Sequence, residues 1–489
     1  MKLSQKTLRA LPPSIKVPEY DRSKLTPGIV HIGLGNFHRA HQAWYLHRLM
    51  QDGLAQDWAI IGAGVRAGDS AQRDRLMAQD YLTTLIELKP SETSAEVTGP
   101  MTGFVPVEEN NASLIAQMAD PAIRIVSLTV TEGGYFIDPA TKGFDDSHPD
   151  ILHDAAHPAT PKTAFGAMIA ALKIRRDAGN GAFTCMSCDN LQGNGDILRQ
   201  TVSSLARMGD SDLADWIESN CTFPNSMVDC IVPATGPNEL ALAQSLGIED
   251  ASPVTHESFR QWVIEDRFCA GRPEWDKVGA TFTDRVHDYE AMKIRVLNGG
   301  HQIVANAGEV LSIATIAECL AHPQIGAFFA KVAREEIVPH LTAVPGMAPI
   351  EYVELIKERF SNPRIIDTTR RVAFDGSSRH PGFVIPSIKD GIARGTSVSG
   401  LGLAEAIWAR MCAGQREDGS EIEANDPFWG DLNAVALKAR SSPGVWLSQR
   451  KYYGDLAKNR LFVEAFSGWL TMIWEHGVEA AMSRYLRDE

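Results

Sequence analysis

The 489-residue sequence lacks an apolar run long enough to span a bilayer, which takes about 20 mostly apolar residues. Its start, Met1-Lys2-Leu3-Ser4-Gln5-Lys6, also lacks the apolar core of a signal peptide. Basic residues are fewer than acidic ones, 47 Lys and Arg against 61 Asp and Glu, which gives a net charge of −14. Such a surface repels nucleic acid and acidic membranes. We therefore expect a cytoplasmic protein that binds neither.

Cysteine is also scarce, and the seven residues are scattered, which is typical of reduced thiols rather than a disulfide framework. Cys185 and Cys188 are three apart on an expected strand, so their side chains point to opposite faces. The spacing of His153 and His157 resembles a two-histidine zinc helix. However, the segment that contains these histidines is bounded by two His-Pro pairs, which predict a loop and therefore a poor zinc site. No metal site is predicted, and the G-x-S-x-G motif of serine hydrolases is missing.

The chain is too long for one ordinary core, and its pattern changes near residue 285. Before that point, short apolar strands alternate with helical segments, which predicts an α/β fold with a Rossmann-type, doubly wound parallel sheet. After it, apolar residues recur at spacings of three and four, which predicts a mainly α-helical domain. The strands are expected at 29–32, 58–65, 81–88, 104–107, 123–130 and 183–187. The later helices are expected at 297–320, 324–337, 352–360, 401–412 and 459–474. We place the domains at residues 1–285 and 286–489, with an active site in the cleft between them.

A glycine turn follows the first strand and precedes a helix, which is the context of a dinucleotide fingerprint. Gly33 allows a tight turn, and Gly35 lets the backbone approach a pyrophosphate. His38 occupies the place of the usual third glycine, so a purely structural turn is the alternative. After the second strand, Asp69 favours the ribose of NAD, whereas Arg66 would accommodate the extra phosphate of NADP. Either residue could instead be a solvated turn residue.

The segment from Lys293 to Gln302, KIRVLNGGHQ, brings a potential base, an amide and an imidazole together. On an α-helix Asn298 and His301 share a face, and Lys293 lies about 80° away from His301. Lysine is a weak base at its free pKa of about 10, but desolvation beside a positively charged ring lowers the pKa of a lysine. Asn298 could then donate to a developing alkoxide. The alternative interpretation is a surface lysine, a helix amide and a capping histidine.

Asn190 is a second candidate amide, since it follows the strand at 183–187 and ligands bind at the carboxyl ends of parallel strands. The alternative is turn chemistry, for which Asp-Asn and Asn-Gly pairs are well suited.

Four motifs in order resemble those of the polyol-specific long-chain dehydrogenases, over nearly the whole chain. They are residues 28–42, 131–135, 187–195 and 293–301. The resemblance implies zinc-independent, NAD-dependent oxidation of a sugar alcohol at C2 to a ketose, such as D-mannitol to D-fructose. It implies Lys293 as the general base, Asn190 and Asn298 as oxyanion-hole amides, and His301 as a residue that positions the substrate. D-Arabinitol and D-sorbitol are further expected substrates.

The resemblance also implies the binding residues. Val228 and Asp229 line the sugar site, Arg371 contacts it, and Glu290 lies near a proton path. The cofactor would lie against Ile32, Gly33, Leu34, Gly35, Asn36, Phe37, Arg66, Asp69, Thr131 and Glu132. The expected partners are a small polyol or ketose, and the expected assembly is a monomer or a weak homo-oligomer.

One departure from the family lies beside the sugar-binding aspartate. The family signature Val-Asp-Arg-Ile-x-Pro is here Val228-Asp229-Cys230-Ile231-Val232-Pro233, and Cys221 also replaces an expected aliphatic residue. A cysteine supplies neither the charge nor the forked donors of arginine. We expect the missing arginine to affect structure rather than substrate choice, which stays open.

Two alternative functions remain. A hexuronate reductase acting on fructuronate or tagaturonate would need a basic pocket, which Arg371 and Arg379 could supply. A non-catalytic nucleotide sensor would keep the glycine turn but would have no need of Lys293, Asn190, Asn298 and His301 together.

Overall fold

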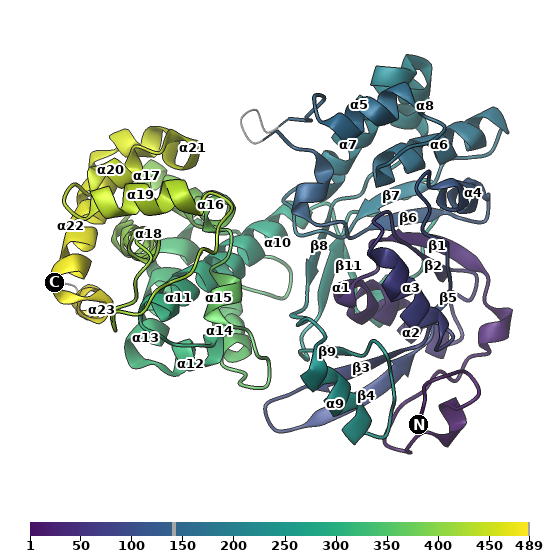
Figure 1. Ribbon diagram of the computed structural model, residues 1–489, viewed down its shortest axis with the longest axis horizontal. Coiled ribbons are helices and arrows are strands. Elements are labelled where there is room, and N and C mark those ends of the chain that lie inside the picture. The colour runs from purple at the N-terminus through teal and green to yellow at the C-terminus, as the bar shows by residue number, and fades with distance from the viewer. Residues whose placement is uncertain (139–142, 488–489) are drawn as a thin grey trace. The chain divides into compact units, whose positions relative to one another are not determined.

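The computed structural model describes residues 1–138 and 143–487, and the side chain of Glu132 also lies outside the described part. The chain divides into two compact units, Met1–His287 and Asp288–Glu489. The first carries the sheets and the second is built of helices (Figure 1).

The first unit contains a five-stranded sheet in the order β5-β2-β1-β6-β7, and all its pairings are parallel. These strands are β1 (Pro27–Ile32), β2 (Ala59–Ala63), β5 (Met101–Phe104), β6 (Ile125–Leu128) and β7 (Thr184–Ser187). From β1, the chain adds β2 and then β5 toward one edge of the sheet. It then places β6 on the other side of β1 and adds β7 at the opposite edge. The order therefore reverses between β1 and β6, which is where doubly wound sheets bind their ligands.

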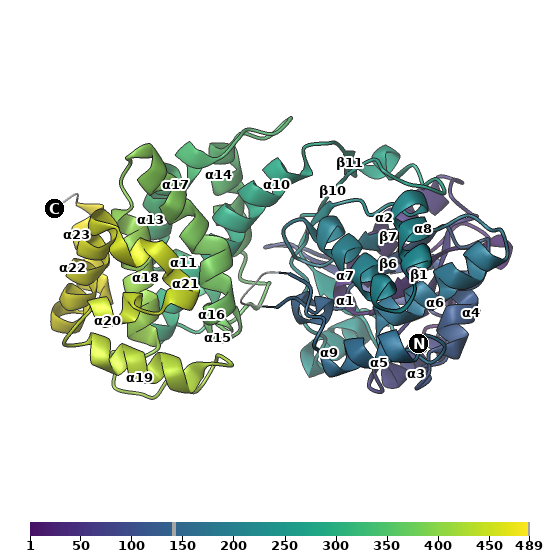
Figure 2. The same ribbon diagram turned by 90° about the horizontal axis from the view of Figure 1, so that it is seen from above.

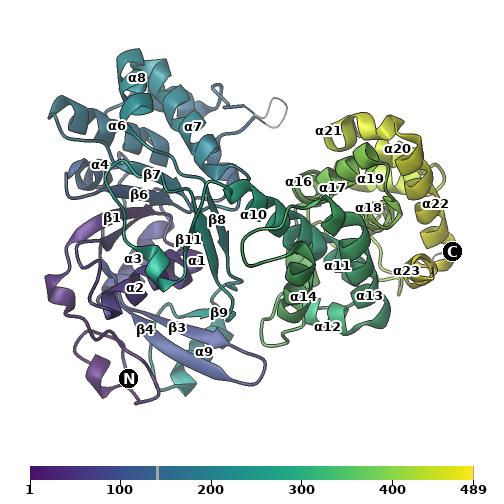
Figure 3. The same ribbon diagram turned by 180° about the vertical axis from the view of Figure 1, so that it is seen from behind.

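Helices cover both faces of this sheet, as Figures 1 and 3 show. One face packs against α4 (Ala112–Ala119), α5 (Pro149–Ala156), α6 (Ala164–Asp177), α7 (Asn194–Gly209) and α8 (Ser211–Asn220). The other packs against α2 (Gln42–Gln51) and α3 (Asp69–Met77). Because the strands are buried on both faces, they read as continuous apolar runs in the sequence. The Rossmann-type prediction is confirmed.

Two smaller sheets complete the first unit. The strand expected at 81–88 forms, but as β3 (Thr83–Leu88) it pairs with β4 (Thr93–Thr98) and β9 (Val254–His256) instead of the main sheet. The third sheet joins β8 (Ser226–Asp229), β10 (Gln261–Ile264) and β11 (Thr281–Phe282). Helix α9 (Pro237–Ser245) follows β8.

The loop predicted around His153 and His157 is wrong. Residues Pro149–Ala156 form helix α5, whose first turn begins with Pro149 and is capped by the His148 side chain. Proline is favoured at the first position of a helix because its missing N–H would have no partner there. Across the described residues, no group of three or more His, Cys, Asp or Glu side chains could hold a metal ion.

The second unit is helical, and no sheet strand occurs among its described residues (Figure 2). Its helices of eight or more residues are α11 (Gly299–Val310), α13 (Pro323–Val332), α14 (Pro349–Phe360), α17 (Ile385–Arg394), α18 (Ser399–Met411), α19 (Trp429–Ala439), α22 (Arg460–His476) and α23 (Val478–Leu486). The prediction of a mainly α-helical C-terminal domain is confirmed.

One detail of the helical prediction changes. The segment expected at 297–320 breaks at Ser312, which has a left-handed backbone with φ of +60°, and α12 (Ile316–Ala321) follows separately. On α22, the buried stripe contains Phe462, Phe466, Leu470 and Ile473, and this helix packs against α18. Among the described residues, no helix is both long and apolar enough to cross a membrane.

Candidate functional site

The first turn after β1 has one glycine that the backbone requires and one that it does not. Gly33 has φ of +91°, and a Cβ atom there would lie 2.1 Å from the carbonyl oxygen of Thr129. Gly35 has φ of −88°, and a Cβ atom there would meet only the Gly33 oxygen, at 4.0 Å. Ile32 and Leu34 bury their side chains in the core, so only their backbone can face a ligand. The backbone at Gly35 is therefore not covered by neighbouring atoms, so a ligand group can approach it closely.

Buried side chains beneath this turn fix its shape. The His31 ring lies 2.8 Å from the Ser127 hydroxyl and 2.9 Å from the Thr129 hydroxyl. The Thr129 hydroxyl in turn donates to the Gly33 carbonyl over 2.6 Å. Burial lowers the pKa of His31 to about 3, so the ring is neutral and links β1 to β6 without a buried charge.

The side chains of Asn36 and Phe37 contact other residues of the first unit. Asn36 donates to the Pro233 carbonyl and the Thr235 hydroxyl, and it accepts from Arg39. Phe37 stacks on His41 with 4.8 Å between ring centroids. Both residues can therefore contribute to the turn through their backbone.

Asp69 is the first residue of α3, in the segment that follows β2. Its Oδ2 atom accepts from the backbone N–H groups of Val65 and Arg66, over 3.1 Å and 3.0 Å. The exposed Arg66 side chain lies 3.9 Å from the other oxygen. The Asp69 carboxylate is thus held in a fixed position near the carboxyl edge of the sheet. It serves as a turn residue, and it is also placed where an acid could bind a ribose.

Asp189, which the sequence does not single out, connects the segment after β7 to the segment after β6. Its carboxylate accepts from the N–H groups of Val130 and Thr131, over 3.0 Å and 2.9 Å. It also accepts from the buried Tyr135 hydroxyl over 2.7 Å. Asn190 is the next residue and is half-buried. Thr131 and Asn190 are therefore held at the same edge of the sheet as Gly33.

The end of β7 is also tied to β8. The Asn194 amide donates to the carbonyls of Ser187, Asp189 and Ser226, and its oxygen accepts from the Ser226 N–H over 2.9 Å. Val228 and Asp229, at the end of the same strand, are buried. The link joins Asn194, shortly after β7, to Ser226, the first residue of β8, and no local signal in the sequence reveals it.

Cys230 is buried directly after β8. The neighbouring strand β10 pairs Gln261 with Asp229, and Arg260 precedes it. Arg260 donates to the Ala40 carbonyl over 2.8 Å and lies over the Trp44 ring. Arg260 thus fixes the segment before β10 to residues 40–44 in a chain that has a cysteine at position 230.

The segment with the candidate base is not a regular α-helix. Lys293–Asn298 forms a π-helical turn between α10 (Val286–Met292) and α11. This wider turn invalidates the angle of about 80° between Lys293 and His301, which holds only for an α-helix. Lys293 is 7% exposed and Asn298 is 8% exposed, so the interpretation as a surface lysine is wrong. Such π-helical turns are frequent at functional sites.

His301 lies within α11 and is not a capping residue. Its ring stacks on Phe360, with centroids 4.1 Å apart and planes at 12°. The next residue, Gln302, donates to the Val372 carbonyl over 3.0 Å, and Arg379 donates to the same carbonyl over 2.7 Å. The second unit therefore brings His301 and Arg379 to neighbouring helices, while Glu290 is buried in α10.

Arg371 lies on the short helix α15 (Thr369–Val372), and its guanidinium is already paired. Two of its nitrogens contact the two carboxylate oxygens of Asp367, at 2.8 Å and 2.7 Å. Burial raises the pKa of Asp367 although Arg371 acts to lower it. The guanidinium side chain remains 60% exposed, so it can still donate to a neutral ligand.

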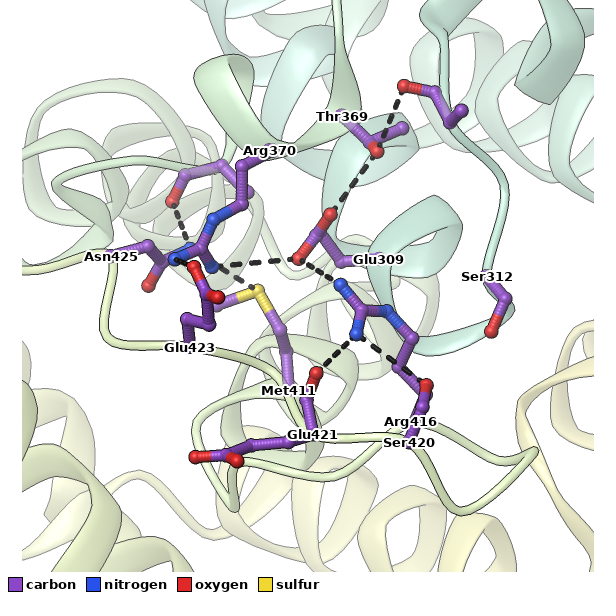
Figure 4. A network of polar contacts seen from close by, with 12 residues as sticks. Glu309, Ser312, Thr369, Arg370, Met411, Arg416, Ser420, Glu421, Glu423 and Asn425 are labelled. Atoms are coloured by element: carbon purple, nitrogen blue, oxygen red, sulfur yellow. Dashed lines mark hydrogen bonds and ion pairs between the residues drawn. The ribbon is translucent and has the colours of Figure 1, made fainter.

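A buried carboxylate joins α11 to α15 (Figure 4). Glu309 has a side chain that is only 4% exposed, and it lies 3.7 Å from Arg370 and 3.5 Å from Arg416. The Thr369 hydroxyl donates to its other oxygen over 3.3 Å. This cluster fixes the helix that carries His301 against the helix that carries Arg371.

We expect Glu309→Ala to lower the free energy of unfolding by about 2 kcal/mol, because two partly buried arginines then lose the carboxylate that they share. Glu423→Ala is the matched control, since Glu423 also pairs with Arg370 but its side chain is 87% exposed. The control should change stability by less than about 0.5 kcal/mol. Urea denaturation measures both, and equal effects of the two changes would contradict the account.

Two family models together cover most of the chain. The mannitol dehydrogenase Rossmann domain matches residues 27–277, and the mannitol dehydrogenase C-terminal domain matches residues 285–474. The chain belongs to the mannitol dehydrogenase family. This confirms the resemblance drawn from the four motifs and, with it, the class of enzyme, an oxidoreductase acting on polyols.

Individual relatives agree with this membership. A mannitol 2-dehydrogenase of Cereibacter sphaeroides is 54% identical over 473 residues, which cover 97% of this chain and 99% of the relative. The structure of Pseudomonas fluorescens mannitol 2-dehydrogenase, a ternary complex with NAD and D-mannitol, matches with a TM-score of 0.91 and 39% identity, covering 100% of both chains. A substrate-free D-sorbitol dehydrogenase matches with a TM-score of 0.90 and 34% identity, covering 98% of this chain and 100% of that one.

Proposed function

We propose that the protein is an NAD-dependent mannitol 2-dehydrogenase that interconverts D-mannitol and D-fructose without a metal. D-Arabinitol and D-sorbitol are further expected substrates. The observation that carries the proposal is the buried Lys293 at the start of a π-helical turn that ends at Asn298, in a chain similar throughout to mannitol 2-dehydrogenases.

The first unit would hold the cofactor. The open backbone at Gly35 and the reversal of strand order between β1 and β6 fit a dinucleotide. Asp69 would accept from the adenosine ribose, which favours NAD over NADP, and Thr131 would border the same edge of the sheet. Bound NAD supplies the acceptor for the hydride that leaves the alcohol carbon.

The chain's own residues would handle the proton and the charge on oxygen. Lys293 takes the proton of the C2 hydroxyl, and the amides of Asn190 and Asn298 donate to the oxygen as it becomes an alkoxide. His301 orients the substrate, with its ring plane set by Phe360. Glu290, buried one turn before Lys293, would border the path by which the proton leaves.

We assign substrate binding to Val228 and Asp229 of the first unit and to Arg371 and Arg379 of the second. Asp229 is a carboxylate, which suits the hydroxyl groups of a neutral polyol and would repel an anionic one.

The pairing of Arg371 distinguishes this proposal from a hexuronate reductase. A uronate carboxylate needs a basic group, and Arg371 is the more exposed candidate. Its charge is already neutralised in a two-bond pair with Asp367, and Arg379 donates to backbone carbonyls. Both contacts favour an uncharged substrate.

Initial rates with D-mannitol, D-arabinitol, D-sorbitol and D-mannonate test the proposal, with a chelator present and with NAD and NADP compared. We expect chelator-resistant reduction of NAD with the free polyols and little rate with D-mannonate or NADP. Activity confined to D-mannonate would assign the protein to the uronate reductases, no turnover would support a sensor, and loss of activity with chelator would contradict the metal-free mechanism.

The two glycines of the first turn should respond differently to alanine. Gly33→Ala should lower the free energy of unfolding by about 3 kcal/mol, because its positive φ and the close Thr129 carbonyl leave no room for Cβ. Gly35→Ala should leave stability within about 1 kcal/mol yet weaken NADH binding about tenfold or more, because the added methyl group occupies the ligand's position. Thermal unfolding and NADH fluorescence titration measure the two effects, and normal NADH affinity in Gly35→Ala would refute the cofactor position.

The remaining predictions concern location and assembly. We expect the protein to be cytoplasmic and to exist as a monomer or a weak homo-oligomer, which sedimentation at several concentrations would test.

A further inference from the structure

A single amide connects the cofactor turn to the connection between β8 and α9. Asn36 is the residue directly after Gly35, and its Nδ2 atom donates to the Pro233 carbonyl over 3.1 Å and to the Thr235 hydroxyl over 2.9 Å. Its Oδ1 atom accepts from the buried Arg39 over 2.7 Å. These contacts join parts of the chain nearly two hundred residues apart in sequence, since the Asn36–Thr235 separation is 199.

Arg39 holds the Asn36 amide in place through the contact with its oxygen. It is fully buried, its Nε atom donates to the Gly35 carbonyl over 3.3 Å, and its guanidinium also donates to the Ser252 carbonyl. The Thr235 hydroxyl donates to the Pro253 carbonyl over 2.6 Å. Thr235 therefore uses its one proton on Pro253 and its lone pair on Asn36, so the hydroxyl has a fixed orientation.

The connection that Asn36 holds, residues 230–235, begins directly after Asp229. At its other end it is held by Glu257, whose carboxylate accepts from the Ile231 N–H over 2.6 Å and whose N–H donates to the Ile231 carbonyl over 3.1 Å. The 230–235 connection is thus fixed at Ile231 by Glu257, the residue after β9, and at Pro233 and Thr235 by the cofactor turn. A shift of the turn would be transmitted to the end of β8.

We propose that the hydrogen bond between Asn36 and Thr235 couples the cofactor turn to the polyol-binding end of β8, and that Thr235 is a positioning residue for the substrate. The inference rests on the proposed function, because it takes Gly35 as a cofactor contact and Asp229 as a polyol contact. A cofactor that orders the turn at Gly35 and Asn36 would in this way also order Asp229. Coupling of this kind is reciprocal, so each ligand strengthens the binding of the other.

The test compares Thr235→Val, which keeps the shape but removes the hydroxyl, with Thr235→Ser, which keeps the hydroxyl. Because Thr235→Val removes both hydrogen bonds of the hydroxyl, to Asn36 and to Pro253, we expect it to raise the KM for D-mannitol at saturating NAD about fivefold. The kcat and the NADH affinity of the free enzyme should stay within about twofold, because neither the base nor the cofactor contacts change. Thr235→Ser should restore the KM.

Two results would overturn the coupling. One is an unchanged KM for D-mannitol in Thr235→Val that unfolds at the normal temperature. The other is an equal rise in the KM and in the dissociation constant of NADH, which would indicate general distortion of the turn. Failure of the proposed function is distinguishable, because the unmodified protein would then turn over no polyol.

Discussion

Replacing Lys293 with alanine is expected to lower the kcat for D-mannitol oxidation by about 10³-fold. Lys293 is buried at the start of the π-helical turn that ends at Asn298, and the proposal gives it the role of the base. Loss of the amine leaves the C2 hydroxyl without a base, so the chemical step slows. NADH binding should stay within about twofold, because the cofactor residues lie in the first unit.

Two further measurements separate this effect from damage to the fold. Lys389→Ala is the control, since Lys389 is exposed on α17 of the same unit and should leave kcat unchanged. Added methylamine should restore part of the activity of Lys293→Ala, because a small amine can occupy the space of the missing side chain. A folded Lys293→Ala protein with more than about a tenth of the normal kcat would exclude lysine as the base.

Asn298→Ala should lower kcat by about 10²-fold, the usual cost of losing one oxyanion-hole donor. The side chain is 8% exposed at the last position of the π-helical turn, so it can donate where water is largely excluded. The KM for D-mannitol should change much less than kcat, because the amide binds the developing alkoxide more strongly than the neutral hydroxyl. Steady-state kinetics at saturating NAD measure both constants.

Asn220 supplies the comparison for this amide, because its side chain is exposed and donates to a carbonyl of its own helix α8. Asn220→Ala should leave kcat and KM unchanged. If Asn298→Ala raised KM as strongly as it lowered kcat/KM while kcat stayed normal, the amide would serve uniform binding rather than the transition state.

The fold of the first unit could be predicted because its signals are local. Apolar strands at regular spacing and the turn of Gly33 and Gly35 encode a parallel sheet directly. The strand at 81–88 was also predicted correctly as a strand, but its partners were not. Its pairing with β9 joins residues such as Leu85 and Val254, and nothing local specifies such a distant pairing.

The sequence yields candidate residues for the site, but it does not predict the geometry of the segments that carry them. A π-helical turn has the same composition as an α-helix, so the spacing of Lys293 and His301 could not reveal it. The pair of Asp367 and Arg371 joins residues four apart, but Asp367 precedes α15, so helical spacing in the sequence does not predict the contact. The role of Asp189 in holding Thr131 depends on two loops meeting in space, which the sequence does not show.

Deuterium transfer tests the central claim most directly, that a hydride leaves C2 of D-mannitol for NAD. The substrate is D-mannitol deuterated at C2 and C5, which are equivalent in this symmetric molecule, and the assay contains a chelator. The account predicts that one deuterium appears in the reduced cofactor, that D-fructose keeps the other, and that the rate is slower than with unlabelled substrate. An unlabelled reduced cofactor, with both deuterium atoms retained in an aldose product, would contradict it.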